Sequence, residues 1–273
     1  MTGRPVTTIC QVLRMGRATA YRTCKPRQRH YQRHEDPLVY EQLREVLRNR
    51  GSYGSRRSTV LVNRAFGTRY NRKRIRRVMR LTGLSLPMRG RRRNRRAHRG
   101  RVIRPDPNQR WCSDVFEIPC WNGEVVCVAF ALDCCDREAM AYEARVWSVS
   151  GASIRRLMRR TVSSRFGSRK PEPPIQWLTD NEAIYTSLET VIEAEKLGLV
   201  PITTPVASPE SNGMAEAFVN TMRRDYLDRA DLSTAARVLE QLPAWFDDYN
   251  TVAPHSALGY RAPLEFRRQL VSL

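Results

Sequence analysis

The feature that most constrains this chain is the uneven distribution of its charge. Residues 1–110 contain 31 Lys and Arg against 5 Asp and Glu, whereas residues 111–273 contain 17 against 22, and the whole chain has a formal net charge of +21. This asymmetry predicts a basic arm joined to a nearly neutral folded domain. A basic region of this kind is typical of proteins that bind nucleic acid.

Composition excludes several other classes of protein. With 41% hydrophobic residues the chain can bury a core, so wholesale disorder is disfavoured. The longest apolar run covers residues 125–132 and is too short to span a membrane, and residues 1–24 contain no signal-peptide core. A basic helix lying on a membrane surface also fits poorly, because the arginines are not confined to one helical face.

The cysteines favour a reducing compartment. The chain has seven of them, an odd number, and no Cys-x-x-Cys pair. Reduced thiols are therefore expected, and a zinc site is not. Together with the missing signal peptide, this predicts a cytoplasmic protein that is not attached to a membrane.

Helical periodicity and turn residues divide the chain into four parts. Residues 1–35 have the size of a short helix-turn-helix, and residues 36–85 carry a stronger pattern of three helices, which predicts a helix-turn-helix DNA-binding domain. Residues 86–110 resemble a basic linker rich in Pro and Gly, and residues 111–273 form the remaining domain.

The basic region supplies the residues expected to contact DNA. The third helix of the 36–85 domain is crowded with cations that have no acid among them, so phosphates are expected to relieve their repulsion. The alternative is a solvated basic face. The candidate DNA-binding residues are Arg72, Lys73, Arg74, Arg76 and Arg77 in this helix, and Arg91, Arg92, Arg93, Arg95 and Arg96 in the linker.

The pattern after Trp111 predicts an α/β domain. Three strands are expected near residues 111–118, 125–132 and 139–146, and helices then alternate with strands near 175–178 and 199–203. Three antiparallel strands followed by alternating elements indicate a mixed sheet flanked by helices.

Three acids stand where a purely structural explanation is difficult. Asp114 interrupts an apolar strand, Asp180 directly follows another strand, and Glu216 lies in the first turn of a helix. Carboxylates that meet at strand ends suit Mg²⁺, which prefers hard oxygen ligands. Two such ions can support an in-line phosphoryl transfer without a Ser, Cys or His nucleophile.

Each acid alone has a structural alternative. Asp180 could cap a helix that begins near Ile184, and Glu216 could interact with the positive end of its own helix. Asp114 is harder to explain in this way, because Asp has a low propensity for strand interiors. Taken together, the three acids favour a metal site.

The spacing of the three acids and the short sequence motifs around them resemble those of a known family. Sixty-five residues separate Asp114 from Asp180, and 35 separate Asp180 from Glu216. The short motifs around these acids are typical of the same family. They are NQRWCSD, WLTDN and SPESNGMAE, followed by the tail from DYN to PHSALGYRAP. The chain thus resembles the DDE transposases of bacterial insertion sequences, related to retroviral integrases, and among them the second-reading-frame product of elements of the insertion-sequence-2 type.

The resemblance covers essentially the whole chain and implies both a fold and an activity. The fold would be a ribonuclease-H-like catalytic core behind an all-α helix-turn-helix region. The activity would be DNA recombination: strand cleavage at the terminal inverted repeats of an insertion sequence, followed by strand transfer and integration into target DNA. Asp114, Asp180 and Glu216 would be the catalytic metal ligands for two Mg²⁺ or Mn²⁺ ions.

The resemblance also implies partners and further contacts. Members usually carry Lys or Arg seven residues after the glutamate, where this chain has Arg223, and Arg224 follows it as a second candidate DNA contact. Helical spacing places Glu216, Asn220 and Arg223 on one face. The enzyme would act as a homo-oligomer on double-stranded DNA near the bacterial nucleoid, either alone or fused to the product of an upstream reading frame.

One departure from the family pattern concerns the second aspartate. Relatives generally have Asp-Asn-Gly-Ser, whereas this chain has Asp180, Asn181, Glu182 and Ala183. We expect the missing glycine to remove a backbone freedom, and Glu182 to add negative charge beside the substrate phosphate. Both effects would weaken this enzyme.

Two other functions remain open at this stage. The first is a catalytically inactive DNA-binding regulator or inhibitor of transposition derived from such an enzyme. The second is a ribonuclease-H-like nuclease acting on RNA–DNA hybrids, which the basic arm and the 35-residue gap disfavour.

Overall fold

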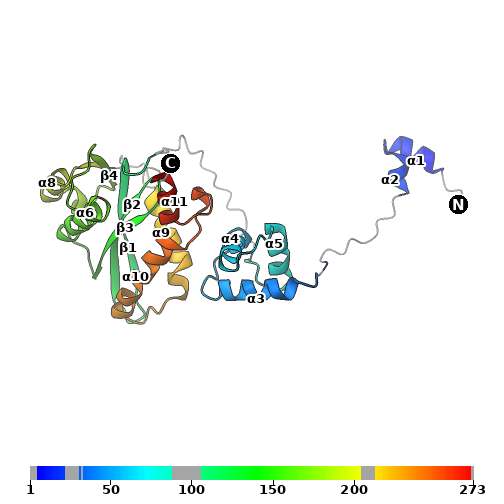
Figure 1. Cartoon of the computed structure of the whole chain (residues 1–273), viewed down its shortest axis with the longest axis horizontal. Coiled ribbons are helices and arrows are strands. Elements are labelled where there is room, and N and C mark those ends of the chain that lie inside the picture. Colours follow the sequence, from blue (N-terminus) through cyan, green and yellow to red (C-terminus); the bar gives the residue numbers. More distant parts are fainter. Residues whose placement is uncertain (1–4, 22–30, 32, 88–105, 204–212, 272–273) are drawn as a thin grey trace.

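The computed structural model describes residues 5–21, 31, 33–87, 106–203 and 213–271. These residues form helices in the first part of the chain and an α/β domain after Asp106 (Figure 1). The helices of the first part are α1 (Val6–Val12), α2 (Arg17–Ala20), α3 (Asp36–Leu47), α4 (Ser55–Ala65) and α5 (Arg72–Leu81).

Helices α3, α4 and α5 pack around one small core. Its buried members come from all three helices and are Val39, Leu43, Val62, Ile75, Val78 and Met79. Helix α5 begins where the sequence predicts, because the Asn71 side chain accepts a hydrogen bond from the Lys73 amide at 2.8 Å. Leu38 differs from expectation: it is exposed, because the apolar face of α3 is narrower than the sequence pattern suggested.

The α/β domain is built on a five-stranded mixed sheet, which confirms the predicted fold class. Its strands are β1 (Arg110–Pro119), β2 (Val125–Asp133), β3 (Ala139–Val146), β4 (Ile175–Thr179) and β5 (Leu199–Thr203). Their order is β3-β2-β1-β4-β5. The first three strands pair antiparallel, whereas β4 pairs parallel with both β1 and β5.

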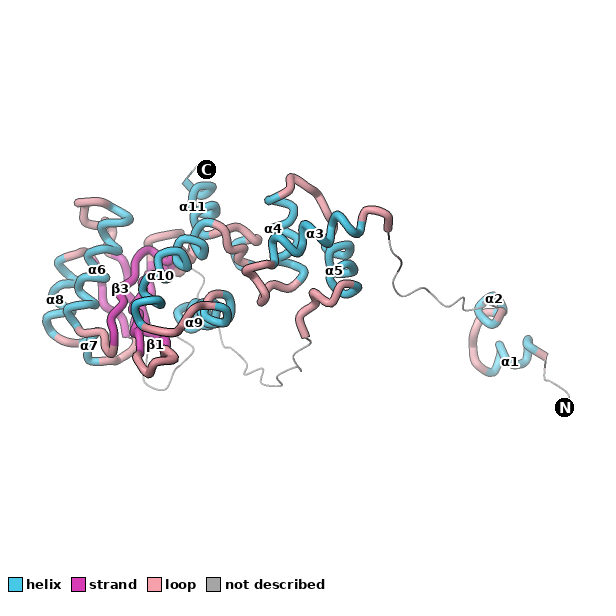
Figure 2. Tube along the Cα trace, turned by 90° about the horizontal axis from the view of Figure 1, so that it is seen from below, coloured by secondary structure: helices cyan, strands magenta, loops and turns pink. Residues whose placement is uncertain are grey.

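Helices cover both faces of this sheet (Figures 1 and 2). One face carries α6 (Gly151–Phe166), α7 (Ala183–Thr186) and α8 (Leu188–Lys196). The other carries α9 (Gly213–Asp225) and α10 (Ala235–Thr251). The short 3-10 helices Leu227–Arg229 and Ser256–Leu258 and the helix α11 (Pro263–Val271) complete this side.

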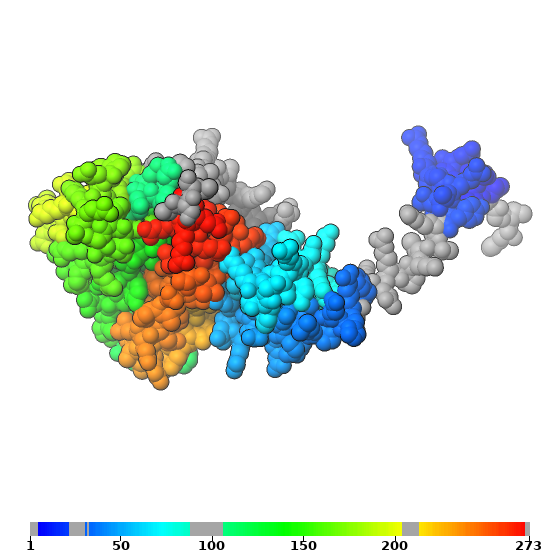
Figure 3. Space-filling model, viewed as in Figure 1, coloured from blue at the N-terminus to red at the C-terminus, as the bar shows by residue number. Residues whose placement is uncertain are grey.

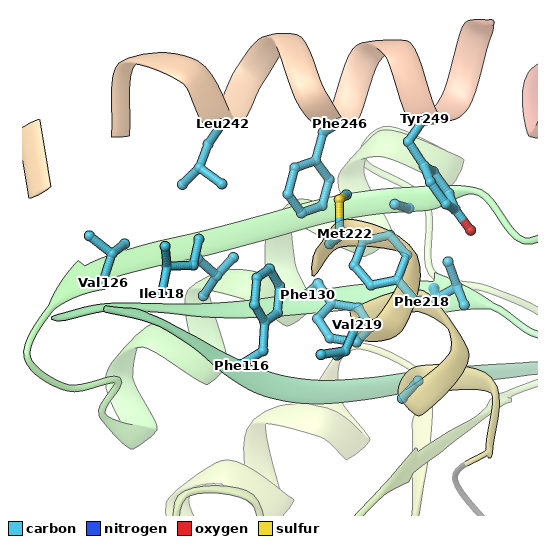
Figure 4. Packing of buried hydrophobic residues seen from close by; sticks show 14 of the residues in the cluster. Phe116, Ile118, Val126, Phe130, Phe218, Val219, Met222, Leu242, Phe246 and Tyr249 are labelled. Atoms are coloured by element: carbon cyan, nitrogen blue, oxygen red, sulfur yellow. The ribbon is translucent and has the colours of Figure 1, made fainter. Parts of the chain in front are cut away.

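Strand β2 divides its side chains between two cores. Val126, Val128 and Phe130 pack with residues of α9 and α10, while Ala129 and Ala131 pack with residues of α6. In Figure 4, Leu242 and Phe246 of α10 and Phe218 of α9 lie over Phe130. This burial on both faces explains the long apolar run in the sequence.

The helical domain contacts the α/β domain through ion pairs (Figure 3). Arg57 at the start of α4 binds Asp225 at the end of α9, with Nη1 2.6 Å from Oδ2, and Ser52 also donates to Asp225. Arg50 donates to Asp248 of α10 at 3.1 Å. Because the Asp225 side chain is only 3% exposed, this contact is an interior one.

Within the described ranges, no helix is both long and apolar enough to cross a membrane.

Candidate active site

Asp114 points toward the helix that carries Glu216. Side chains alternate along β1, and Cys112 and Phe116, two positions on either side of Asp114, both pack in the core formed with α9 and α10. Asp114 therefore belongs to the same face of the sheet. Its own Oδ1 accepts a hydrogen bond from the Val115 amide at 2.8 Å.

The parallel pairing of β1 and β4 brings Asp180 beside Asp114. The register aligns Cys112 with Leu178, where the described pairing ends. Asp114 and Asp180 each lie two residues further along, so both extend from the carboxyl-terminal edge of this strand pair. Leu178 packs in the same core as Cys112, and alternation therefore directs Asp180 to the same face of the sheet as Asp114.

Helix α9 places Glu216 above this edge. Ala215, Phe218, Val219 and Met222 of α9 are buried against the sheet, and this packing fixes the helix in position. Glu216, Asn220 and Arg223 are exposed on another face of the same helix. The predicted alignment of these three residues is thus present in the structure.

The pKa of Asp114 reflects both its burial and the acids near it. Burial raises the pKa of Asp114, and the nearby negative charges of Asp180, Glu182 and Glu216 raise it further, to about 6, against the opposing hydrogen bond from Val115. Residues separated by more than 60 positions in the sequence therefore share one electrostatic environment.

In the described part of the structure, these carboxylates do not form a complete metal-binding site. Among the described residues, no three His, Cys, Asp or Glu side chains are close enough together to hold a metal ion. The donor chemistry nevertheless fits a hard divalent cation, because the converging groups are carboxylates and their mutual repulsion is unrelieved. Residues 204–212, which lead into α9, lie outside the described part of the chain.

The Asp180 turn corrects one expectation and supports another. Glu182 has a φ of −66° and a ψ of 145°, which any L-residue adopts, so the missing glycine removes no backbone freedom that this turn needs. The Glu182 carboxylate contributes to the raised pKa of Asp114, and its effect on a substrate phosphate stays a prediction. The Glu182 amide donates to Asp180 Oδ1 at 3.2 Å, and the cap of α7 is Glu182, not Asp180.

A buried polar pair that the sequence analysis missed lies beneath this site. The hydroxyls of Ser113 and Tyr185 are 3.1 Å apart, and both residues are buried. Burial raises the pKa of Tyr185 far above its usual value, so the phenol stays protonated. Tyr185 connects α7 to the strand that carries Asp114, and no sequence motif marks it for this role.

The candidate DNA-binding residues of α5 divide into two groups. Arg72, Lys73 and Arg76 are exposed. Arg74 and Arg77 are instead half-buried and paired with acids at the start of α3: Arg74 contacts Glu35 at 2.8 Å, and Arg77 forms a short contact with Asp36. The expectation that only phosphates could relieve these charges was therefore wrong for Arg74 and Arg77.

The remaining candidates are located as follows. Arg223 is exposed on α9, and Arg224 pairs with Asp225 through Nε and Oδ1 at 2.8 Å. The linker candidates Arg91, Arg92, Arg93, Arg95 and Arg96 lie outside the described residues.

The side chain of His255 is held by contacts within the fold. Its Nε2 lies 3.3 Å from the Tyr249 carbonyl oxygen, and burial lowers its pKa to about 4. Phe246 and Tyr249 are buried in the core, as expected for helix packing.

Three family models match this chain. A model described as an integrase core domain matches residues 104–209, and a second model with the same description matches residues 197–263. A model described as an HTH-like domain matches residues 33–92.

Curated relatives cover most of the chain. Transposase InsD for insertion element IS2A/D/F/H/I/K of Escherichia coli is 42% identical over 243 residues, which are 86% of this chain and 80% of that protein. Transposase InsD for insertion element IS2-9 of Escherichia coli strain K12 is also 42% identical over 243 residues, and this alignment covers 86% of this chain and 78% of that protein.

Solved structures with a similar fold have much lower sequence identity to this chain. A simian T-cell lymphotropic virus intasome in complex with the PP2A regulatory subunit B56 gamma aligns with a TM-score of 0.48 and 15% identity, covering 60% of this chain and 56% of that one. The Mos1 transposase catalytic domain with raltegravir and Mg aligns with a TM-score of 0.43 and 18% identity, covering 51% and 71%.

Proposed function

This chain belongs to the family of insertion-element transposases with an integrase core domain, and from that membership we propose that it cleaves and joins DNA strands at the ends of an insertion sequence. The observation that supports this proposal most strongly is the strand register, which brings Asp114 and Asp180 to one edge of the sheet, with Glu216 on a helix packed over the same face. These are the three acids that the family motif selects.

The carboxylates of Asp114, Asp180 and Glu216 would hold the divalent cations, with two Mg²⁺ or Mn²⁺ ions per site. When bound, such cations supply activation of the attacking oxygen and stabilisation of the leaving oxygen in an in-line displacement. Water serves as nucleophile in cleavage and a DNA 3′-hydroxyl in strand transfer, so one site can perform both steps. The raised pKa of Asp114 supports this role, because a cation would relieve the repulsion that raises it.

The protein's own residues position the DNA. Arg72, Lys73 and Arg76 on the exposed face of α5 would bind phosphates near the element end. Arg223, one helical turn beyond Asn220 on the face of Glu216, would hold a phosphate beside the reacting strand. The linker arginines would add sequence-independent affinity.

Joining two element ends requires more than one chain, so we propose a homo-oligomer assembled on double-stranded DNA. The partners would be the terminal inverted repeats and the target duplex. A fusion to the product of an upstream reading frame would supply an additional segment.

The direct test uses a labelled duplex that carries the element end, incubated with the chain and Mg²⁺ or Mn²⁺. Cleavage that exposes a 3′-hydroxyl, followed by transfer to a second duplex, is the expected result. Asp180→Asn should abolish both reactions and retain DNA binding. Cleavage that is insensitive to this substitution would contradict the proposed site.

A second candidate function is favoured by one observation. Glu182 adds a fourth carboxylate to the cluster and thereby increases the negative charge that a DNA phosphate would meet. A chain that binds the element end but does not cleave it with either metal would be a regulator of transposition. The same assay, performed on the unmodified chain, separates the two functions.

A further inference from the structure

A cavity of about 550 Å³ lies between the helical domain and the α/β domain. Five parts of the chain line it: the start of α4, the end of β2 with the turn that follows it, one face of α9, Tyr249 of α10, and the segment 253–260. The ion pairs of Asp225 with Arg57 hold the two domains together at this point, so the cavity is a feature of the docked arrangement.

The cavity is separate from the proposed active site. It is lined by Met214, Ala217 and Thr221 of α9, which recur at intervals of three and four residues along one side of the helix. Glu216 and Asn220 lie on a different side and do not line it. A ligand in this cavity would contact α9 without occupying the position of the three carboxylates.

The lining of the cavity is strongly positive. It contains Arg56, Arg57, Arg137 and Arg224 against a single carboxylate, that of Asp225. Asp225 is already shared by two of these cations, with Arg57 Nη1 at 2.6 Å and Arg224 Nε at 2.8 Å. Within the described residues, Arg56 and Arg137 have no carboxylate partner.

Arg137 is held at the cavity wall by a rigid turn. The turn is anchored by Asp136, whose carboxylate binds the fully buried guanidinium of Arg165 at 2.9 and 3.0 Å. Arg137 itself has a φ of 62° and is half-buried. Arg137 lines the same cavity as Tyr249 and His255. A half-buried cation without a counter-ion is costly, and an incoming anion would remove that cost.

We propose that this cavity binds phosphates of the DNA backbone and thereby holds the duplex against the surface where α4 and α9 meet. The proposal rests on the proposed function, because it assigns an additional contact to the same DNA. The volume exceeds that of one phosphate group, and the cavity opens between the two domains that would each contact DNA. The hydroxyls of Ser55 and Ser256 also line it and can donate hydrogen bonds to phosphate oxygens.

The test measures the salt dependence of DNA binding by the full chain, with fluorescence anisotropy on an element-end duplex and on an unrelated duplex. Each phosphate contact that is lost lowers the slope of log K against log salt by about 0.9. Arg56→Gln combined with Arg137→Gln should lower the slope by about two on both duplexes, because backbone contacts are independent of sequence. Arg56→Gln alone, at an exposed position, should lower it by about one.

The matched control is Arg169→Gln combined with Lys196→Gln, which removes two exposed cations from the side of the domain formed by α6 and α8. This control should keep the parental slope. Parental slopes in both Arg56 variants, together with intact cleavage by the parent chain, would overturn the cavity proposal and leave the proposed function standing. A parent chain that neither binds nor cleaves duplex DNA would overturn both.

Discussion

At the scale of single residues, burial first and then the like charges of neighbouring acids make Asp114 costly to ionise. Asp114 is half-buried and faces three other carboxylates, and its pKa of about 6 records the cost of ionising it there. A structural acid at a strand interior would instead be paired with a cation, as Asp225 is. This contrast distinguishes a carboxylate that awaits a ligand from one that stabilises the fold.

Glu182 provides a prediction at this scale. The turn at residue 182 needs no glycine, so charge is the only property of Glu182 expected to affect strand transfer. Glu182→Gln and Glu182→Gly should therefore raise the strand-transfer rate by the same factor, roughly fivefold for a charge interaction of about 1 kcal/mol. A gain with Gly alone would restore the backbone explanation, and no gain with either would show that Glu182 is harmless.

Asp225 provides a second prediction. Burial would raise its pKa, but hydrogen bonds from Arg224, Arg57 and Ser52 outweigh burial and lower the pKa to about 2. Because the folded pKa is depressed, this contribution to stability is present above pH 4 and is lost as the pH falls toward 2. Asp225→Asn should lower the free energy of unfolding by about 2 kcal/mol at pH 7. Denaturant titrations should show this difference narrowing below pH 4, and a difference independent of pH would contradict the assignment.

At the scale of elements, local patterns predicted most of the α/β domain. The strands near residues 111, 125, 139, 175 and 199 occur where the sequence pattern predicted them, and helices alternate with the last two as expected. Helix α11 was not predicted, since the family motif that precedes it drew the interpretation away from its helical pattern. The pairs of Arg74 and Arg77 with acids at the start of α3 were also missed, because periodicity within one helix says nothing about charges on its neighbours.

Two neighbouring arginines of α5 are expected to have different roles, one in DNA binding and the other in stability. Arg76 is exposed, whereas Arg77 is paired with Asp36 and the two side chains are 11% and 12% exposed. Arg76→Gln should weaken binding to duplex DNA and lower the salt slope by about 0.9 without changing the melting temperature. Arg77→Gln should instead destabilise the domain by about 1–3 kcal/mol, because it removes the shortest ion pair of the mostly buried Asp36 carboxylate and leaves the Arg33 amide and the longer contact with Arg74. The opposite assignment of effects would contradict the division of this helix into two faces.

At the scale of the whole molecule, charge separation in the sequence correctly indicated a basic helical part and a nearly neutral α/β part. How the two parts dock was beyond the sequence, because the decisive pairs join residues 168 and 198 positions apart. Neither partner in such a pair has a local pattern that identifies the other. The family motif alone selected the three acids in the sequence, whereas the parallel register that brings Asp114 and Asp180 to one edge comes from the structure.

The central claim is that Asp114, Asp180 and Glu216 together bind divalent cations when DNA is present. The most direct measurement is a titration with Mn²⁺, followed by electron paramagnetic resonance, of the chain bound to an element-end duplex. We predict two bound ions per chain, with loss of this binding in Asp114→Asn, Asp180→Asn and Glu216→Gln alike. Unchanged Mn²⁺ binding in any of these three variants would contradict the account.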